Sequence, residues 1–325
     1  MPLQAPLPHN GAGPKRPDIE ALRLLSALGI VWFHAAHSAI ALAYSGLVVF
    51  LVLSVALGGR SGRPDAATLQ RRALRLLRPW LFWCGLYAAF NAVRGLPAWP
   101  LDAGWVAGVL AGPSIHLWYL PFMFGVLVLL DLLRAHVALR TLATTGFVMA
   151  LALMATAPWW RPVTLSLIYP ALQWADALAP VAVGVFVLGA RSNCWSRRTV
   201  LAMAAALVLT ATVLVAFEWI GTPYAVGIAA SLLVLVLRRQ PSGQAVQAPQ
   251  LQQPVQPWLA WPGGFMALTD CSFGIYLSHS LVFSLLLAHG PALPEGMLPV
   301  AIFALALAAI WLLRSGLPRV AAAVT

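Results

Sequence analysis

Long apolar runs, separated by short polar segments, make up most of this chain. A helix needs roughly 20 mostly apolar residues to cross a bilayer, and runs that do not alternate between apolar and polar positions favour helices over barrel strands. We therefore expect an all-α, polytopic helical membrane protein with about ten transmembrane helices. The expected spans are residues 19–42, 44–59, 79–94, 114–133, 141–158, 171–190, 199–217, 223–237, 265–289 and 296–313.

The composition independently favours a bilayer as the solvent. Of the 325 residues, 61% are hydrophobic and only 9% are charged, whereas about a quarter of the residues of a soluble domain are charged. So few charges leave too little polar surface to cover a water-soluble protein of this size. The cysteines have no metal-ligand spacing, so no metal site is expected; they are Cys84, Cys194 and Cys271.

The basic residues test the number of spans. With the N-terminus in the cytoplasm, all lysines and arginines except Arg94 and Arg161 fall on the cytoplasmic side. One missed span would reverse every later loop and destroy this asymmetry. The positive-inside rule therefore favours ten spans with both termini in the cytoplasm. The same placement accounts for the net charge of +11, so no nucleic-acid partner is expected.

The chain is expected to hold one membrane domain, over residues 18–314. Residues 1–17 are rich in proline and predict a disordered cytoplasmic tail. Residues 240–257 are rich in glutamine and proline, and we expect them to form a cytoplasmic linker within the domain. Residues 315–325 are expected to form a second cytoplasmic tail.

The first expected span contains an arginine and two histidines. Arg23 and His34 are eleven residues apart, which returns them to within roughly 20° of the same helical face with a rise of roughly 16 Å. His37 follows three residues later, near the same face. Ionisable groups deep in a membrane are costly and usually face a cavity or a partner. The alternative is a structural histidine that bonds a neighbouring helix.

Three arginines recur at every third position just before the third span. Arg72, Arg75 and Arg78 would lie roughly on one side of a helical segment. The planar guanidinium group pairs bidentately with phosphate oxygens, so this segment is suited to a phosphate-bearing ligand. The alternative is that the cluster only sets topology and attracts anionic headgroups.

Two later histidines lie in other spans. His116 is at the outer mouth of the fourth span, next to Trp118, where on its own it would be an interfacial anchor. His279 lies about as far into the ninth span as His34 lies into the first, so the two rings are expected at similar depth and in one cavity. Asp270 is near the inner end of its span, where a cytoplasmic arginine would neutralise it.

Taken in order, these motifs resemble acyltransferase family three, the bacterial membrane-bound O-acyltransferases that include polysaccharide acetyltransferases. The matching positions are Glu20, Arg23 and His34, then Arg72, Arg75 and Arg78, then the HLWYL segment 116–120, then the SFGIYLSH segment 272–279. The chain departs from the family pattern at Glu20, where aspartate is usual, and in its long Gln/Pro-rich linker.

The resemblance implies transfer of an acyl group, usually acetyl, from cytoplasmic acyl-CoA to a hydroxyl of a carbohydrate or glycoconjugate acceptor. It places the protein in the bacterial cytoplasmic membrane, with acyl-CoA as donor substrate and no permanently bound cofactor. His34 is then the catalytic residue, either as general base or as transient acyl carrier, since a histidine has an unperturbed pKa of about 6.5. Glu20 is expected to assist it.

The resemblance also divides the remaining residues between donor and acceptor. Arg72, Arg75 and Arg78 would hold the phosphates of CoA, and Arg23 would help them or line the pantetheine path. The acceptor side would be lined by His37, His116, Trp118, Tyr276 and His279.

Two other functions fit some of these residues. A transporter or exporter of a polar or anionic solute would also use buried arginine and histidine, although the chain shows no pair of matching halves. A non-catalytic membrane assembly subunit would tolerate loss of the histidines.

Overall fold

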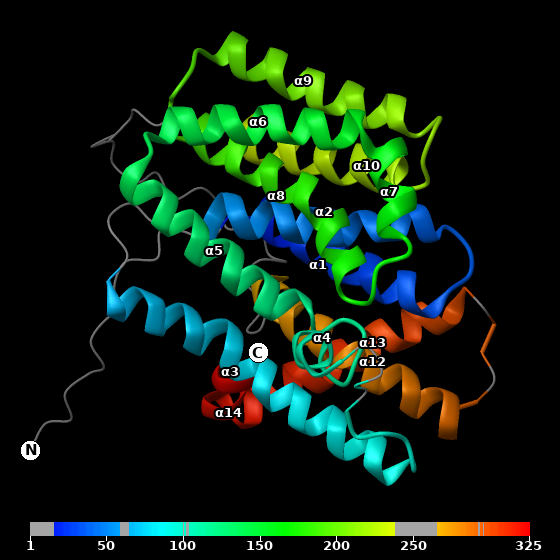
Figure 1. Cartoon of the computed structure of the whole chain (residues 1–325). Helices are drawn as coiled ribbons and strands as arrows, with labels where there is room; N and C mark the ends of the chain where they lie inside the picture. Colours follow the sequence, from blue (N-terminus) through cyan, green and yellow to red (C-terminus); the bar gives the residue numbers. More distant parts are fainter. Residues whose placement is uncertain are drawn as a thin grey trace, which may run out of the picture.

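The computed structural model describes residues 16–58, 65–99, 101, 104–237, 265–291, 293–294 and 296–325, and all regular elements in this part of the chain are helices (Figure 1). Most of the predicted N-terminal tail and the whole 240–257 linker lie outside the described residues. So do several basic residues used to predict the topology, namely Lys15, Arg60, Arg63, Arg238 and Arg239.

Nine long helices form the body of the described structure: α1 (Pro17–Ala35), α2 (Ile40–Gly58), α3 (Ala66–Val93), α5 (Tyr119–His136), α6 (Leu139–Ala155), α8 (Ala171–Arg191), α9 (Arg197–Leu214), α12 (Ser272–His289) and α13 (Met297–Gly316). Shorter helices are α4 (Trp105–Ala111), α7 (Ala157–Thr164), α10 (Gly221–Leu232, continued by a π-helical turn at Leu233–Leu237), α11 (Phe265–Thr269) and α14 (Pro318–Val324). Each segment expected to span the membrane is occupied by one of these helices or by two in succession.

Six helices are long and apolar enough to cross a membrane: α2, α5, α8, α9, α12 and α13. The pair α6–α7 would count as a seventh, bent by 75° at its break. Helix α1 falls outside this set because Asp18, Glu20 and Arg23 crowd its first two turns. A multi-pass helical fold is thus established, while ten crossings and the sidedness of the termini stay predictions.

The first span is shorter than predicted. Helix α1 ends at Ala35 and α2 begins at Ile40, with Ala39 at a positive φ of 55° in the turn between them. The indole N–H of Trp32 donates to the Ser38 carbonyl over 3.0 Å and holds this turn. His37 therefore lies exposed in the turn, and the prediction that it shares a helical face with His34 is wrong.

The predicted C-terminal tail is instead a packed helix. Arg78 donates to the carbonyls of Ala322 and Ala323 over 2.9 and 3.1 Å, and the indole of Trp83 donates to the Val324 carbonyl over 2.8 Å. These bonds satisfy carbonyls at the end of α14, where a helix has no intrahelical donors left. They attach α14 to α3.

The helices pack around the pair α1–α2. In Figure 1, α6, α8, α9 and α10 lie on one side of this pair, and α3, α12, α13 and α14 lie on the other. The backbone of α2 approaches α1 most closely where Gly46 faces Ser26, because a side chain there would collide with the α1 backbone. Each side has its own cluster of buried apolar residues.

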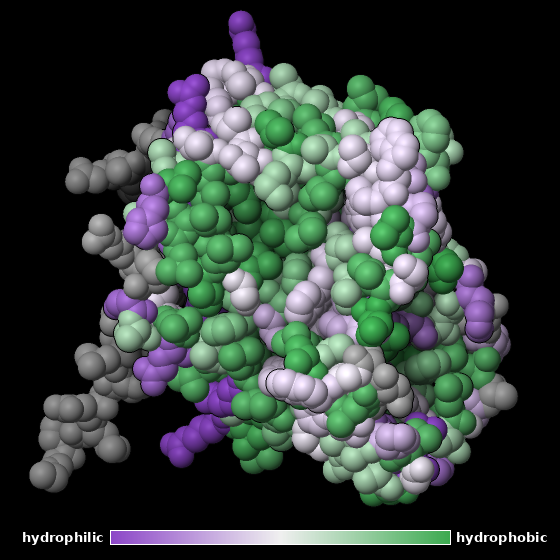
Figure 2. Space-filling model, in the orientation of Figure 1, coloured by the Kyte–Doolittle hydropathy of each residue, from purple (hydrophilic) through white to green (hydrophobic). Residues whose placement is uncertain are grey.

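The outer surface is suited to lipid. Leu25, Leu209 and Leu287 are each 64% exposed, which is costly in water but not in hydrocarbon. Figure 2 shows a broad hydrophobic area on the visible face, with strongly hydrophilic residues gathered mainly along its left edge. A contiguous apolar surface of this kind is typical of a membrane contact.

Candidate active site

Three histidine rings meet inside the bundle. The ring centroid of His279, on α12, lies 5.2 Å from that of His34, on α1, and 4.7 Å from that of His116, in the turn before α5. The expectation that His34 and His279 lie together is confirmed. His116 is only 2% exposed, so its placement as an interfacial anchor is wrong. It lies in the interior because α5 begins only at Tyr119 and the preceding turn folds inward.

Hydrogen bonds determine which nitrogen of His116 carries the proton. Its Nε2 lies 3.2 Å from the Leu277 carbonyl, which can only accept, so Nε2–H is the donor. In the neutral ring Nδ1 is then the acceptor, and the hydroxyls of Ser114 and Ser280 lie 3.2 and 3.1 Å from it. This ring is fixed in one tautomer and has no basic nitrogen left for a substrate.

The same reasoning applies to His279 but not to His34. The Nδ1–H of His279 donates to the Tyr276 carbonyl over 2.7 Å, and its Nε2 lies 3.2 Å from the Ser280 hydroxyl. Among the described residues, no hydrogen bond holds the His34 ring, which contacts the rings of Phe33 and His279. Of the three histidines, His34 is the one whose nitrogens are available to a ligand.

His34 opens into a cavity of about 240 Å³, which we call the histidine cavity. His279 contacts the two histidines in its wall without lining it, so the expectation that His34 and His279 line one cavity is wrong. The lining residues are Ile30, Phe33, His34, Tyr44, Leu47, Ile115, His116, Trp118, Arg161, Leu172, Gln173, Asp176, Trp219 and Tyr276. The predicted acceptor residues His116, Trp118 and Tyr276 thus lie beside His34.

A second cavity, of about 420 Å³, lies nearer the start of α1, and we call it the arginine cavity. Its polar lining residues are Glu20, Arg23, Ser54, Thr68, Arg71, Arg72, Arg75, Tyr119, Thr269, Asp270, Ser272 and Thr325. The predicted donor residues Arg23, Arg72 and Arg75 are among them. Arg78 is not, and Arg71 is an additional arginine that the three-residue spacing did not select.

Helical geometry explains why Arg71 replaces Arg78. Two side chains six residues apart on a helix point about 120° away from each other, so Arg78 cannot face the same way as Arg72. Two side chains four residues apart differ in direction by only about 40°, so Arg71 and Arg75 share a face. The prediction that Arg72, Arg75 and Arg78 form one surface is wrong in that respect.

The arginines of this cavity are held by different partners. Arg72 makes a bidentate pair with Asp131, at 2.7 and 2.9 Å, and donates to the Gly58 carbonyl over 2.8 Å. Asp131 is buried and Arg72 is nearly so, with 5% and 11% of their side chains exposed. Arg23 pairs with Glu20 over 2.8 Å, one turn earlier on α1. Just before α12, Asp270 lies 3.8 Å from Arg314, so an arginine does lie near this carboxylate as expected.

Two tyrosines separate the cavities. The ring of Tyr119 borders the arginine cavity and the ring of Tyr276 borders the histidine cavity, and their centroids are 5.4 Å apart. Tyr119 exchanges a 2.8 Å hydrogen bond with Ser54, and the hydroxyl of Tyr276 donates to the His116 carbonyl. The two cavities are therefore stacked along α1 with an aromatic wall between them.

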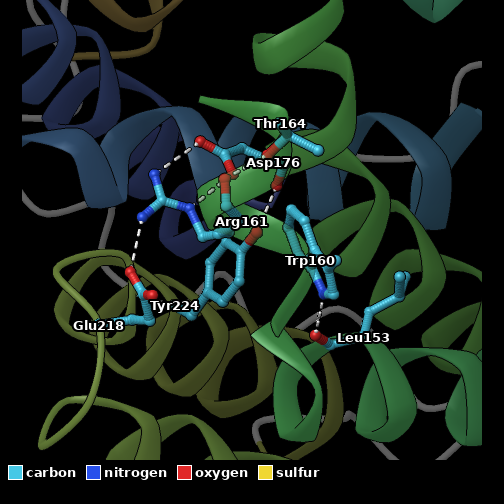
Figure 3. Close-up of polar contacts among 7 residues, drawn as sticks. All are labelled: Leu153, Trp160, Arg161, Thr164, Asp176, Glu218 and Tyr224. Carbon is cyan, nitrogen blue, oxygen red and sulfur yellow. Dashed lines mark hydrogen bonds and ion pairs between the residues drawn. The ribbon is translucent and has the colours of Figure 1, made fainter. Parts of the chain in front are cut away.

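A cluster of charges that the sequence did not reveal borders the histidine cavity (Figure 3). Arg161, on α7, donates to both carboxylate oxygens of Asp176, on α8, over 3.0 and 3.2 Å. Its remaining terminal nitrogen donates to Glu218 over 3.0 Å. Arg161 was predicted only as an outer-loop residue. The signal that could have found the cluster was Asp176, an acidic residue inside an expected span, where charges are costly.

Residues 16–314 match a protein-family model described as an acyltransferase domain. No curated protein and no solved structure matches the chain. The matched region contains both cavities apart from Thr325, at the edge of the arginine cavity.

Proposed function

The chain belongs to acyltransferase family three, and on that premise we propose that it is an integral membrane O-acyltransferase. It moves an acyl group, most simply acetyl, from acyl-CoA to a hydroxyl of a carbohydrate or glycoconjugate acceptor. The observation that carries this proposal is the stacking of a cationic cavity and a histidine cavity along one helix.

The arginine cavity supports binding of the donor. Arg23, Arg71 and Arg75 line it, and guanidinium groups pair strongly with phosphate oxygens such as those of CoA. Arg23 and His34 are separated by a rise of roughly 16 Å along α1. The long pantetheine arm of CoA would carry the thioester across this distance, past Tyr119 and Tyr276.

The histidine cavity supports the transfer step. In the proposed reaction His34 takes the proton from the acceptor hydroxyl while its oxygen attacks the thioester carbonyl. A new C–O bond forms, the C–S bond breaks, and the proton passes from His34 to the departing CoA thiolate. General base catalysis of this kind contributes about 10²–10⁴-fold in rate. The variant in which His34 carries the acyl group itself would leave an acyl-histidine that can be trapped without acceptor.

The proposed topology follows the arginines. Arg134 follows Asp131, the partner of Arg72, on α5, and Arg314 lies 3.8 Å from Asp270 in the lining of the arginine cavity. Arg140 lies at the start of α6, next along the chain, and Arg191 ends α8, where Gly189 packs against Ala143 of α6. We place the side that carries these arginines in the cytoplasm, with ten crossings and both termini inside, in the bacterial cytoplasmic membrane. Acyl-CoA then has direct access from the cytoplasm.

The test uses the full chain, purified in detergent with radiolabelled acetyl-CoA. His34→Ala is expected to lower acetyl-CoA turnover by about 10²-fold or more. The matched control is His289→Ala, at the exposed end of α12. Undiminished turnover in His34→Ala would remove His34 from catalysis. If the unaltered chain neither hydrolyses acetyl-CoA nor transfers its acyl group, and instead moves a polar solute across vesicles, the chain is a transporter.

A further inference from the structure

The histidine cavity contains polar groups that the proposed reaction does not use. Arg161 and Asp176 line it, and they are almost fully buried, with 6% and 7% of their side chains exposed. Glu218 completes the cluster, with 17% exposed. Burying one arginine with two carboxylates costs solvation free energy, which a purely structural contact between α7 and α8 does not require.

The guanidinium of Arg161 is committed to these carboxylates. Its Nε, Nη1 and Nη2 atoms all donate to Asp176 or Glu218. Two carboxylates thus converge on one guanidinium (Figure 3), and the formal charges of the three groups sum to −1. No other arginine or lysine is among the described residues that line the cavity. An anionic ligand would therefore find a carboxylate and no available cation.

An amide next to this cluster lacks a partner. The Oε1 atom of Gln173 is buried without a hydrogen-bond partner in the described structure, and Gln173 lines the same cavity one helical turn before Asp176. A buried acceptor left unpaired costs about 1–3 kcal/mol, and an amide oxygen can only accept a hydrogen bond. The ligand that satisfies it is a donor such as a hydroxyl. Trp118 and Trp219 add aromatic surface to the same wall.

We propose that Gln173 and the Arg161–Asp176 pair form the acceptor subsite, and that this subsite selects an uncharged sugar ring over a uronate or phosphorylated sugar. The sugar hydroxyls donate to the Gln173 oxygen and to the Asp176 carboxylate, while one further hydroxyl faces His34. This inference rests on the proposed acyl transfer and names its acceptor class.

The experiment compares two matched pairs of acceptors with the full chain in detergent and saturating acetyl-CoA: methyl glucoside with methyl glucuronide, and methyl galactoside with methyl galacturonide. The kcat/KM for the neutral member is expected to be about tenfold higher or more, which is about 1.4 kcal/mol. Glu218→Gln should reduce this ratio to about threefold or less, because the cluster loses its net charge. Gln173→Leu should raise KM for the neutral sugar about tenfold and change KM for acetyl-CoA little.

The control is Asp65→Asn, an exposed carboxylate at the N-cap of α3, where asparagine caps as well as aspartate. It should leave the neutral-to-uronate ratio unchanged. Equal or better use of the uronates, or turnover of acetyl-CoA that no neutral sugar accelerates, would overturn the subsite while leaving acyl transfer intact. Absence of any acetyl-CoA turnover would instead reject the proposed function. If a variant unfolds, the ratio measured on the unaltered chain still decides.

Discussion

The arginine cavity and the histidine cavity are both lined by α1, but their polar groups differ in kind. The first holds formal charges in ion pairs, such as Arg72 with Asp131 and Arg23 with Glu20. Beside His34 the second has the imidazole rings of His116 and His279, which each donate one N–H to a backbone carbonyl and present the other nitrogen to the hydroxyl of Ser280.

The comparison shows how enclosure decides which polar groups a site can hold. A partly exposed guanidinium, such as that of Arg23 with 30% of its side chain exposed, can keep water or a phosphate as partner, so its charge is tolerated. In an enclosed site a lone charge is costly to bury. A neutral histidine, which can accept and release a proton, costs less free energy to bury. The Arg161 cluster is charged at the histidine cavity, where both carboxylates pair with the one Arg161 guanidinium.

The largest effect is expected for Arg72. Its replacement tests whether this residue stabilises the structure around the arginine cavity or binds the donor. Arg72→Ala leaves Asp131 buried without its partner, so we expect a loss of about 3–5 kcal/mol in the free energy of unfolding. Thermal unfolding in detergent measures it. The matched variant Arg71→Ala removes a side chain that is 56% exposed and 3.9 Å from Asp65, and should cost less than about 1 kcal/mol. A stable Arg72→Ala that fails to bind acyl-CoA would make Arg72 a ligand residue.

A smaller effect tests which arginines meet the donor. Arg75→Ala should raise KM for acetyl-CoA about tenfold or more, because a hydrogen bond to a charged group contributes about 1.5–3 kcal/mol. Arg78→Ala is the matched control, since Arg78 bonds carbonyls of α14 and does not line the arginine cavity. Equal changes in KM for the two variants would mean that lining the cavity gives Arg75 no special part in donor binding. Both arginines would then serve only to set the membrane topology.

The smallest expected effect concerns the histidine cavity. Ser280→Ala removes a hydroxyl shared by His116 and His279, and we expect a loss of about 1 kcal/mol, seen as a few-fold lower kcat with KM for acetyl-CoA unchanged. Ser284→Ala, one turn further along α12, is the comparison variant. Ser280→Ala kinetics identical to those of the unaltered chain would show that the orientation of these two rings does not affect His34.

Local periodicity predicted a good part of the site. The approach of His34 to His279 followed from their similar depth in two spans, and it is confirmed by the 5.2 Å between their rings. Helical periodicity gave the wrong position for His37 because α1 ends at Ala35 and the turn through Ala39 redirects the chain. Periodicity did not address His116, whose turn folds inward ahead of α5 and buries the ring beside His34.

Hydropathy, helical spacing and motif order are local properties, so they were enough to predict the class of protein, the family and the types of residue at the site. The partners of the buried charges that lie far apart in the sequence depended on the tertiary structure. Arg72 meets Asp131 across 59 positions, and Arg161 meets Glu218 across 57. Such pairs depend on which helices pack side by side, and the free energy of burying a charge depends on that packing rather than on neighbours along the chain.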